Sequence, residues 1–346
     1  MLNARIASAF ENSRGYLDTA SYGLPSRATA AALVNAATQW HRADLDPASI
    51  DAPVDRMRAA YAAIVGSESS HVTIAGSTSQ VMGMVAASLP EGAHVLVAHE
   101  DFTSVVWPFA TDPRLTVHPV PLAQLIDHLR PGIDLVAVSA AQSRNGAVVD
   151  LDALATQASA LGIKTVVDAS QAAGWLPLDA HRFDVVVASG YKWLTTPRGL
   201  TFAAVRPEAT WVRPVYASWY GADAPWDHLY GVEPALSAHA RRLDSSPPWL
   251  LAEAGATALE LMASHPIHDA YAHTTGLADE FRARLGLAPA GSAIVSIAAE
   301  PADLAAAGIR ASHRAGRVRV GFHIYNSAAD MERAAAVLSP LQLVAA

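Results

Sequence analysis

Short apolar runs alternate with helix-like segments through the middle of the chain. Amphipathic segments at Ala123–Leu129 and Leu151–Leu161 separate some of these runs. Strands that alternate with helices form a mostly parallel sheet covered by helices on both faces. The pattern therefore predicts an α/β fold whose ligand site lies beyond the carboxyl ends of the strands. The runs that we interpret as buried strands are His94–Ala98, Leu135–Ser139, Thr165–Asp168 and Val185–Ser189.

The last third of the chain has a different pattern. Val212–Pro248 is rich in Trp, Tyr, Pro and His and has no clean period, which is typical of a long active-site or interface loop. A helix is predicted from about Leu250 to Ser264. The rest, Pro266–Ala346, is interpreted as a smaller unit that ends in a helix near Ala328–Leu338.

Composition and charge exclude several classes of protein. Half of the residues are apolar and only 16% are charged, as in a compact enzyme. The formal net charge is −8 and no basic stripe is visible, so we expect neither a nucleic-acid nor a membrane partner. Met1–Arg14 lacks the apolar core of a signal peptide, and no apolar run approaches the ~18 residues of a membrane span. We expect a cytoplasmic protein.

Lysine and cysteine usage narrows the chemistry. The 346 residues contain no cysteine, which removes disulfides, thiolate zinc sites and cysteine nucleophiles. Only Lys164 and Lys192 are lysines among 24 basic residues, so the other 22 are arginines. An arginine cannot act as an amine nucleophile, whereas a desolvated lysine can. Lys164 is interpreted as a surface residue that opens a strand, and Lys192 as the candidate for chemistry.

Two short stretches point to an anionic, ring-shaped ligand. Gly76–Gln80 is a Gly-Ser-Thr turn that opens a helix, and such a turn offers N–H groups and hydroxyls to a phosphate. Taken alone it is weak, since most such turns are helix caps. Asp168 ends a buried strand, where an unpaired carboxylate is costly. A protonated pyridine nitrogen would be a suitable partner, although Asp168 alone could be a cap or turn residue.

Two further stretches supply an amine and a guanidinium. Lys192 lies 24 residues beyond Asp168 in Ala188-Ser189-Gly190-Tyr191-Lys192-Trp193, where it could reach an aldehyde while Ser189 and Tyr191 bind a phosphate. The alternative is a surface lysine at a strand end. Arg319 lies in the apolar stretch Val318-Arg319-Val320, which suits bidentate binding of a carboxylate. The alternative is a structural ion pair.

The combination of Asp168 and Gln171 with Ser189-Gly190-Tyr191-Lys192 resembles the class V aminotransferase family, which includes cysteine desulfurases, selenocysteine lyases, kynureninases and epimerase-like members. The likeness runs from Tyr16-Leu17-Asp18-Thr19-Ala20 to Tyr325-Asn326-Ser327. It implies a pyridoxal 5′-phosphate (PLP) enzyme of fold type I. The large PLP-binding domain, with its mostly parallel sheet flanked by helices, would span residues 16–250. Residues 1–15 with 251–346 would form a smaller C-terminal α+β domain.

The resemblance implies a role for each matching residue. Lys192 would hold PLP as a Schiff base and move the proton at the substrate Cα, and Asp168 would keep the ring nitrogen protonated. Gln171 would bind the ring 3-hydroxyl, and Phe102 would stack on the ring, as on the kynureninase side of the family. Phe102 as a plain core residue is the alternative. The other residues that would contact the cofactor are Thr78, Ser79, Ser189 and Tyr191 around the phosphate, and Gln142 and Ser143 at the cofactor face.

The resemblance also implies a homodimer and an amino-acid substrate. Ser246 falls where a hydroxyl reaches the phosphate of the neighbouring subunit. Arg319 would bind the substrate α-carboxylate, and Tyr22 and Arg144 would also touch the substrate. No metal is expected, since His265, His268 and His273 do not share one helical face and have no acidic cluster beside them.

The reaction stays open between several fates of a Cα carbanion. The expected reaction is transamination or C–S (or C–Se) β-elimination, without a persulfide cysteine because the chain has none. Racemisation or epimerisation is the next alternative. A non-catalytic binding module that keeps the PLP fold is the other, although such a module would be expected to lose Lys192 or Asp168.

Overall fold

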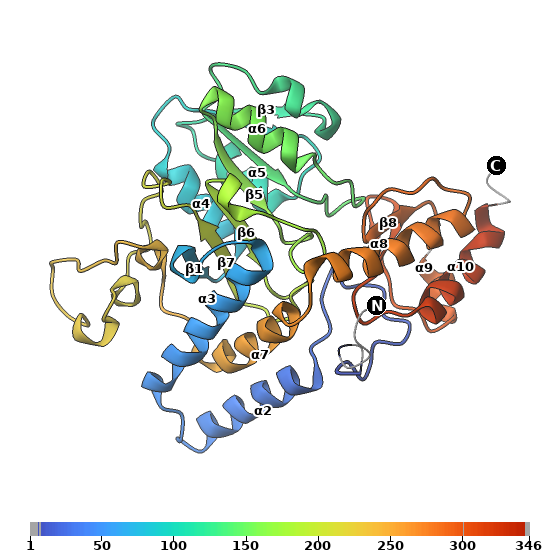
Figure 1. The fold of residues 1–346 in the computed structure, drawn as a ribbon, viewed down its shortest axis with the longest axis horizontal. Helices are drawn as coiled ribbons and strands as arrows, with labels where there is room; N and C mark the ends of the chain where they lie inside the picture. The colour runs from blue at the N-terminus through green and yellow to red at the C-terminus, as the bar shows by residue number, and fades with distance from the viewer. Residues whose placement is uncertain (1–5, 7, 300, 343–346) are drawn as a thin grey trace.

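A seven-stranded sheet forms the centre of the molecule in the computed structural model, which describes residues 6, 8–299 and 301–342 (Figure 1). The strand order is β1-β7-β6-β5-β4-β2-β3. The four runs that the sequence predicts as strands are confirmed, and they lie next to one another in this sheet. The strands are β1 (Val72–Ala75), β2 (His94–Ala98), β3 (Thr116–Val120), β4 (Leu135–Ser139), β5 (Lys164–Asp168), β6 (Val185–Ser189) and β7 (Thr201–Val205).

Five neighbouring strands of this sheet, from β3 to β6, run parallel, whereas β7 is antiparallel to both of its neighbours. Successive side chains of a strand point to opposite faces. In β2, Val95 and Val97 join the core under one layer of helices, and Leu96 and Ala98 join the core under the other. Burial on both faces explains why these strands are continuous apolar runs and not alternating ones.

Helices cover both faces of the sheet (Figure 1). On one face lie α4 (Thr78–Ser88) and α5 (Thr103–Ala110). On the other lie α3 (Asp51–Val65), α6 (Leu151–Leu161) and α7 (Ala252–Ala263), and α2 (Arg27–His41) packs against α7. The prediction of a mostly parallel sheet between helices is therefore confirmed.

A second, antiparallel sheet lies in the C-terminal part of the chain, in the order β8-β10-β9. It has its own core, which contains Val295, Val318 and Phe322. This arrangement confirms the smaller α+β unit. Its elements are α8 (Ile267–Arg284), β8 (Ile294–Ile297), α9 (Pro301–Ala306), β9 (Ser312–Arg314), β10 (Arg317–Gly321) and α10 (Ala328–Gln342).

The boundary between the two units was expected at residue 250. Helix α7 contributes Ala256, Leu259 and Met262 to the core beneath the large sheet. We therefore propose that the large unit extends through α7 and that the small unit begins with α8. Residues 1–5 and 7, 300 and 343–346 of the expected small domain lie outside the described residues.

One predicted helix is wrong. Ala123–Leu129 forms two short 3₁₀ turns, Leu122–Gln124 and Ile126–His128, between Pro121 and Pro131. The stability of a helix in a protein comes mainly from packing, and only Leu125 and Leu129 of this segment are buried. The predicted loop Val212–Pro248 holds only short 3₁₀ turns, as expected of a loop. No helix in the described part of the chain is long and apolar enough to cross a membrane.

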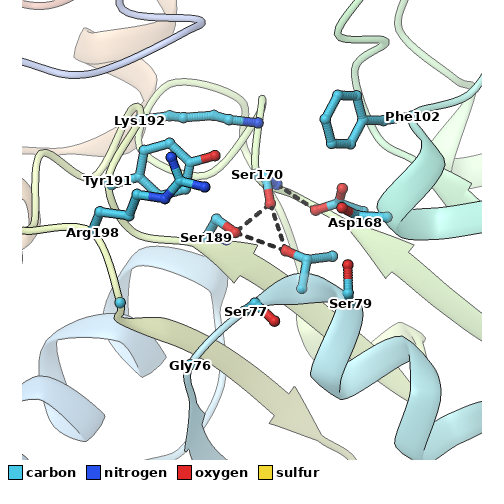
Figure 2. Close-up of a pocket in the computed structure, with 13 residues that line it drawn as sticks. Gly76, Ser77, Ser79, Phe102, Asp168, Ser170, Ser189, Tyr191, Lys192 and Arg198 are labelled. Atoms are coloured by element: carbon cyan, nitrogen blue, oxygen red, sulfur yellow. Dashed lines mark hydrogen bonds between the residues drawn. The ribbon is translucent and has the colours of Figure 1, made fainter. Parts of the chain in front are cut away.

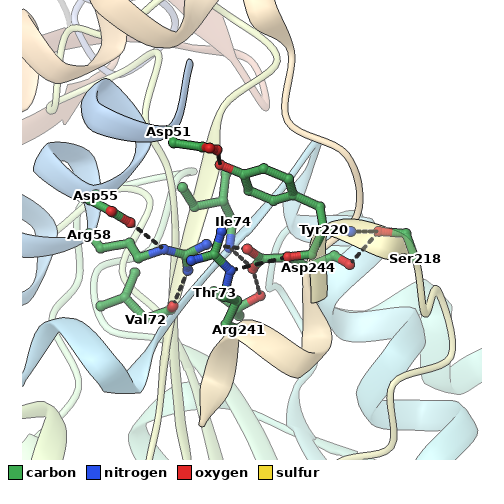
Figure 3. Close-up of polar contacts among 10 residues, drawn as sticks. All are labelled: Asp51, Asp55, Arg58, Val72, Thr73, Ile74, Ser218, Tyr220, Arg241 and Asp244. Carbon is green, nitrogen blue, oxygen red and sulfur yellow. Dashed lines mark hydrogen bonds and ion pairs between the residues drawn. The ribbon is translucent and has the colours of Figure 1, made fainter. Parts of the chain in front are cut away.

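A buried ion pair attaches the end of this loop to the large sheet (Figure 3). Arg58 of α3 pairs with Asp244, and both side chains are almost fully buried. Asp244 also accepts hydrogen bonds from Thr73 Oγ1 (2.7 Å) and the Ile74 N–H (2.9 Å) of β1. Earlier in the loop, the Tyr220 hydroxyl donates a hydrogen bond to Asp51 of α3 (2.7 Å). These polar contacts hold a segment that has no regular secondary structure of its own.

We expect Arg58→Met to lower the free energy of unfolding by about 3–5 kcal/mol, because it leaves the Asp244 carboxylate buried without its cation. Arg56→Met on the same helix is the matched control. Arg56 pairs with Glu253 and Glu260 at the surface, so its loss should cost about 1 kcal/mol or less. Urea unfolding of both variants measures the difference, and equal losses would contradict the prediction.

Candidate active site

A cavity of about 250 Å³ lies beyond the carboxyl ends of β5 and β6 (Figure 2). Its volume is near the lower end of small-molecule clefts, roughly 300 Å³ and above. Parallel strands end at a common edge, which brings together residues that are far apart in the sequence. The lining residues are Gly76, Ser77, Thr78, Ser79, Phe102, Ser104, Asp168, Ser170, Ser189, Tyr191, Lys192, Arg198 and Gly199.

The turn after β6 holds Lys192 in a fixed place. Gly190 is required there, because a Cβ atom would lie 2.3 Å from Thr196 Oγ1. The N-terminal segment packs directly on this turn: the Gly23 N–H donates to the Tyr191 carbonyl (2.9 Å), and a Cβ on Gly23 would lie 1.9 Å from the Lys192 carbonyl oxygen. The backbone around Lys192 is thus confined from two sides.

The Lys192 side chain is buried and its amine faces the cavity (Figure 2). Its Nζ lies 5.2 Å from the centre of the Phe102 ring and 5.7 Å from that of Tyr191. Burial lowers the pKa of Lys192 to about 8, with Asp168 opposing the shift and nearby arginines adding to it. A fraction of the amine is therefore neutral, and so nucleophilic, near neutral pH.

Asp168 is a buried carboxylate that forms no ion pair within the described residues. Its Oδ1 accepts a hydrogen bond from the Ser170 N–H (2.8 Å). Burial raises the pKa of Asp168, and Lys192 and the Ser170 hydrogen bonds oppose that shift. A cationic group of a ligand bound in the cavity would stabilise a carboxylate in this position.

The opposite end of the cavity is suited to an anion. Helix α4 begins at Thr78, and the first N–H groups of a helix together with its dipole favour negative charge. The hydroxyls of Thr78 and Ser189 lie 2.8 Å apart, and Ser170 Oγ is 3.3 Å from Thr78 Oγ1. Arg198 adds a guanidinium beside the Tyr191 ring (Figure 2). This end can hold a phosphate.

Arg319 is buried and makes hydrogen bonds to neutral groups only. It donates to Ser312 Oγ (3.1 Å), Ser143 Oγ (3.0 Å) and Ser21 Oγ (2.8 Å). No acidic side chain of the described residues lies within ion-pair distance of it, so the alternative of a structural ion pair finds no partner. Burial lowers the pKa of Arg319 to about 10, which an added anion would reverse.

The structure brings seven of the predicted residues to the cavity wall. Phe102 is 45% exposed, so it is not a core residue. The predicted residues in the wall are Thr78, Ser79, Phe102, Asp168, Ser189, Tyr191 and Lys192.

Gln171, Gln142 and Ser143 do not line that wall. The Gln171 amide donates to the Ala20 carbonyl (2.8 Å) and Ser143 Oγ (3.2 Å) and accepts from the Trp193 indole (2.7 Å). It cross-links three segments, so its expected contact with the ligand would need one of these bonds to be shared or exchanged. Gln142 is buried, and its side-chain amide has no hydrogen-bond partner among the described residues.

The remaining predicted residues are at the surface. Ser246 and Arg144 are exposed and do not line the cavity. Tyr22 is 44% exposed, and its ring centre lies 5.5 Å from that of Tyr191. No group of three or more His, Asp or Glu side chains suited to a metal ion occurs in the part of the chain that the structure describes.

Four wall residues were not singled out from the sequence: Ser104, Ser170, Arg198 and Gly199. Arg198 follows Lys192 by six residues in Thr195-Thr196-Pro197-Arg198-Gly199. A basic residue shortly after Lys192 was the feature of the sequence that could have indicated Arg198. Arginine is so frequent in this chain that this feature is weak evidence for a site residue.

Comparisons with known proteins agree with this geometry. The model of the family "Aminotransferase class-V" matches residues 27–286. An uncharacterized aminotransferase, YcbU of Bacillus subtilis (strain 168), is 31% identical over 215 residues, which cover 58% of this chain and 56% of that protein. Isopenicillin N epimerase of Streptomyces clavuligerus is 27% identical over 181 residues, covering 47% and 46%. The chain spans about half the length of the curated relatives it matches.

Solved structures share the fold. The cystine C–S lyase C-DES, in complex with its product cysteine persulfide, has a TM-score of 0.82 at 18% identity and covers 95% of this chain and 98% of that one. The cysteine desulfurase CsdA from Escherichia coli has a TM-score of 0.79 at 19% identity, covering 100% and 99%. At this identity the likeness speaks for the fold alone, and it confirms the expected fold type I. With the family model matched over most of its length, the chain belongs to the class V aminotransferase family.

Proposed function

We propose that this PLP-dependent enzyme acts at the Cα of an α-amino acid and catalyses either transamination or C–S (or C–Se) β-elimination. The observation that carries the proposal is the pair of Lys192 and Asp168 at one cavity. Lys192 presents an amine with a pKa of about 8, and Asp168 a buried carboxylate that forms no ion pair with the described residues. A pyridine aldehyde needs an amine to form an imine with its aldehyde and a carboxylate to pair with its protonated ring nitrogen.

The cavity residues fit the cofactor in three places. The α4 N-terminus, the hydroxyls of Thr78 and Ser189, and Arg198 would hold the phosphate. Asp168 would accept a hydrogen bond from the protonated ring nitrogen, which supplies the cation that its buried carboxylate lacks. Phe102 would cover one face of the ring.

When bound, PLP withdraws electrons from the substrate Cα. The residues of the chain would then decide which bond breaks. Lys192 would take the Cα proton, because its amine lies inside the cavity and its lowered pKa leaves it able to accept and return a proton near neutral pH. Arg319 would bind the α-carboxylate through its fork and thereby orient the Cα–H bond. Tyr22 and Arg144 are proposed to touch the side chain of the substrate.

The remaining expected roles also stay proposals. Gln171 would approach the ring 3-hydroxyl, and the unpartnered amide of Gln142 with Ser143 would lie at the cofactor face. Ser246 is exposed in this chain, which is compatible with reaching a neighbouring subunit of a homodimer.

Transamination and β-elimination are favoured over epimerisation. A persulfide relay on this chain is excluded, since none of the 346 residues is cysteine. Direct release of sulfide or selenide needs no cysteine. The match to an isopenicillin N epimerase is the observation that keeps epimerisation as the second candidate.

The reaction is tested by incubating the holoenzyme with a panel of amino acids, with and without an α-keto acid acceptor. β-Elimination should release ammonia and, from cysteine-type substrates, pyruvate and sulfide or selenide without the acceptor. Transamination should consume the acceptor and release no ammonia. Loss of optical purity with neither product would indicate the epimerase. Cofactor binding without any of these changes would indicate the non-catalytic module.

We expect the rate of PLP capture by the apo-protein, followed by visible absorbance, to rise with pH up to about 8 and then level off. Below that pH the Lys192 amine is protonated and cannot attack; above it the amine is neutral. Borohydride should attach the cofactor to the peptide that contains Lys192, and Lys192→Ala should abolish the attachment. Attachment to the Lys164 peptide would refute the assignment.

We expect Asp168→Asn to bind PLP but to lose activity by about tenfold to a hundredfold. The amide removes a charge-assisted hydrogen bond of roughly 2–3 kcal/mol, at 1.36 kcal/mol per decade. The cofactor should stay bound because the anion end of the cavity is unchanged. Steady-state turnover of the PLP-saturated variant is the measurement, and turnover at the wild-type rate would count against the proposed role.

We expect Arg319→Lys to raise KM by roughly tenfold to a hundredfold, because lysine keeps the charge but cannot form the bidentate fork. The visible absorbance of the bound cofactor should not change. An amine that lacks the carboxylate should also lose most of its disadvantage against the parent amino acid. Should the variant discriminate between the two as sharply as the wild type, the carboxylate is bound elsewhere.

A further inference from the structure

A second arginine meets Arg319 at one hydroxyl group. Ser21 Oγ accepts a hydrogen bond from Arg319 Nη2 (2.8 Å) and another from Arg314 Nη2 (3.1 Å). Because both nitrogens bond the same oxygen, they lie no more than two hydrogen-bond lengths apart. A hydroxyl has two acceptor lone pairs and one proton. Both lone pairs are used here, and no hydrogen bond among the described residues uses the proton, so three donors meet at this point.

The cluster has positive charge and no ion-pair partner among the described residues, and the charge of Asp18 only partly opposes the lowered pKa of Arg319. Neither arginine has an acidic side chain within ion-pair distance among the described residues. After burial, the charge of Arg314 is the next largest cause that lowers the pKa of Arg319, and it also contributes to the lowered pKa of Lys192. Two like charges held this close repel each other, and a bound anion would relieve the repulsion.

The β9–β10 hairpin directs the side chains of Arg314 and Arg317 to different partners. The turn between the strands is Ala315-Gly316, with φ angles of 49° and 75°. Positive φ angles at both central residues are those of a tight two-residue hairpin turn. Arg314 and Arg317 face each other across the turn, but Arg314 reaches Ser21 whereas Arg317 reaches Ser296 of β8.

We propose that Arg314 binds a second anionic group of the substrate, so that the substrate is a short α-amino acid with an acidic side chain. The inference rests on the proposed role of Arg319 as the α-carboxylate anchor. Arg314 is exposed, and the side-chain hydrogen bonds that it makes among the described residues go to Ser21 and to the His313 carbonyl, so its side chain can turn toward a ligand without losing a buried contact. The short distance between the two guanidinium groups suits anions separated by two or three carbons, whether the second is a carboxylate, a sulfinate or a sulfonate.

The test is calorimetric binding to the holoenzyme, with succinate and butyrate as probes. Both have four carbons and no amine, and only succinate has the second charge. Wild type should bind succinate more tightly than butyrate by about tenfold, the gain expected of a charge-assisted bond near the surface. Arg314→Gln should reduce this preference to about twofold or less and should leave the affinity for butyrate unchanged.

Arg317→Gln is the matched control, because it removes the same charge from the same hairpin on the side of Ser296. It should keep most of the preference for succinate. Equal binding of the two probes by the wild type, or equal loss of preference in both variants, would overturn the role of Arg314. Arg319→Gln separates the two proposals: it should weaken both probes, and if butyrate binding is unaffected, the anchor of the proposed function fails whatever Arg314 does.

Discussion

The desolvation of Lys192 opposite Asp168 is the constraint on which the rest of the site depends. Parallel strands end at a common edge, so β5 and β6 deliver a carboxylate and an amine to one cavity. Burial works against both charges: it raises the pKa of Asp168 and lowers that of Lys192. Such a pair is costly for folding alone. It becomes favourable when a ligand supplies a ring cation to one residue and an aldehyde to the other.

Polar side chains join three parts of the chain beside the segments that line this cavity. Gln171 bonds the N-terminal segment at Ala20 and the loop after β4 at Ser143. Arg319, from the small sheet, bonds Ser143 and Ser21 in turn. The small unit is thereby tied to the active site through the residue that is proposed to bind the substrate. Substrate binding at Arg319 would therefore act on the contact between the two units.

Charge is distributed along the site in a way that fits a ligand with several anionic groups. Arg198 lies at the proposed phosphate position, Arg319 at the proposed carboxylate position and Arg314 beyond it. None of these arginines forms an ion pair within the described residues. The buried pair of Arg58 and Asp244 is the contrast, because there the protein supplies the anion itself and the contact stabilises a loop.

The sequence by itself determined the parallel strands, Asp168 at the end of β5, Lys192 just after β6 and the Gly-Ser-Thr turn that opens α4, because burial on both faces leaves continuous apolar runs and because lysine is so rare in this chain. Those signals are local. Only the tertiary structure decided that the Gln171 side chain is hydrogen-bonded to Ala20, Ser143 and Trp193. It also decided that Arg198 lines the cavity and that Ser21 accepts hydrogen bonds from both Arg314 and Arg319. These contacts join residues up to 298 positions apart, and no periodicity or short motif encodes which distant hydroxyl a guanidinium will reach.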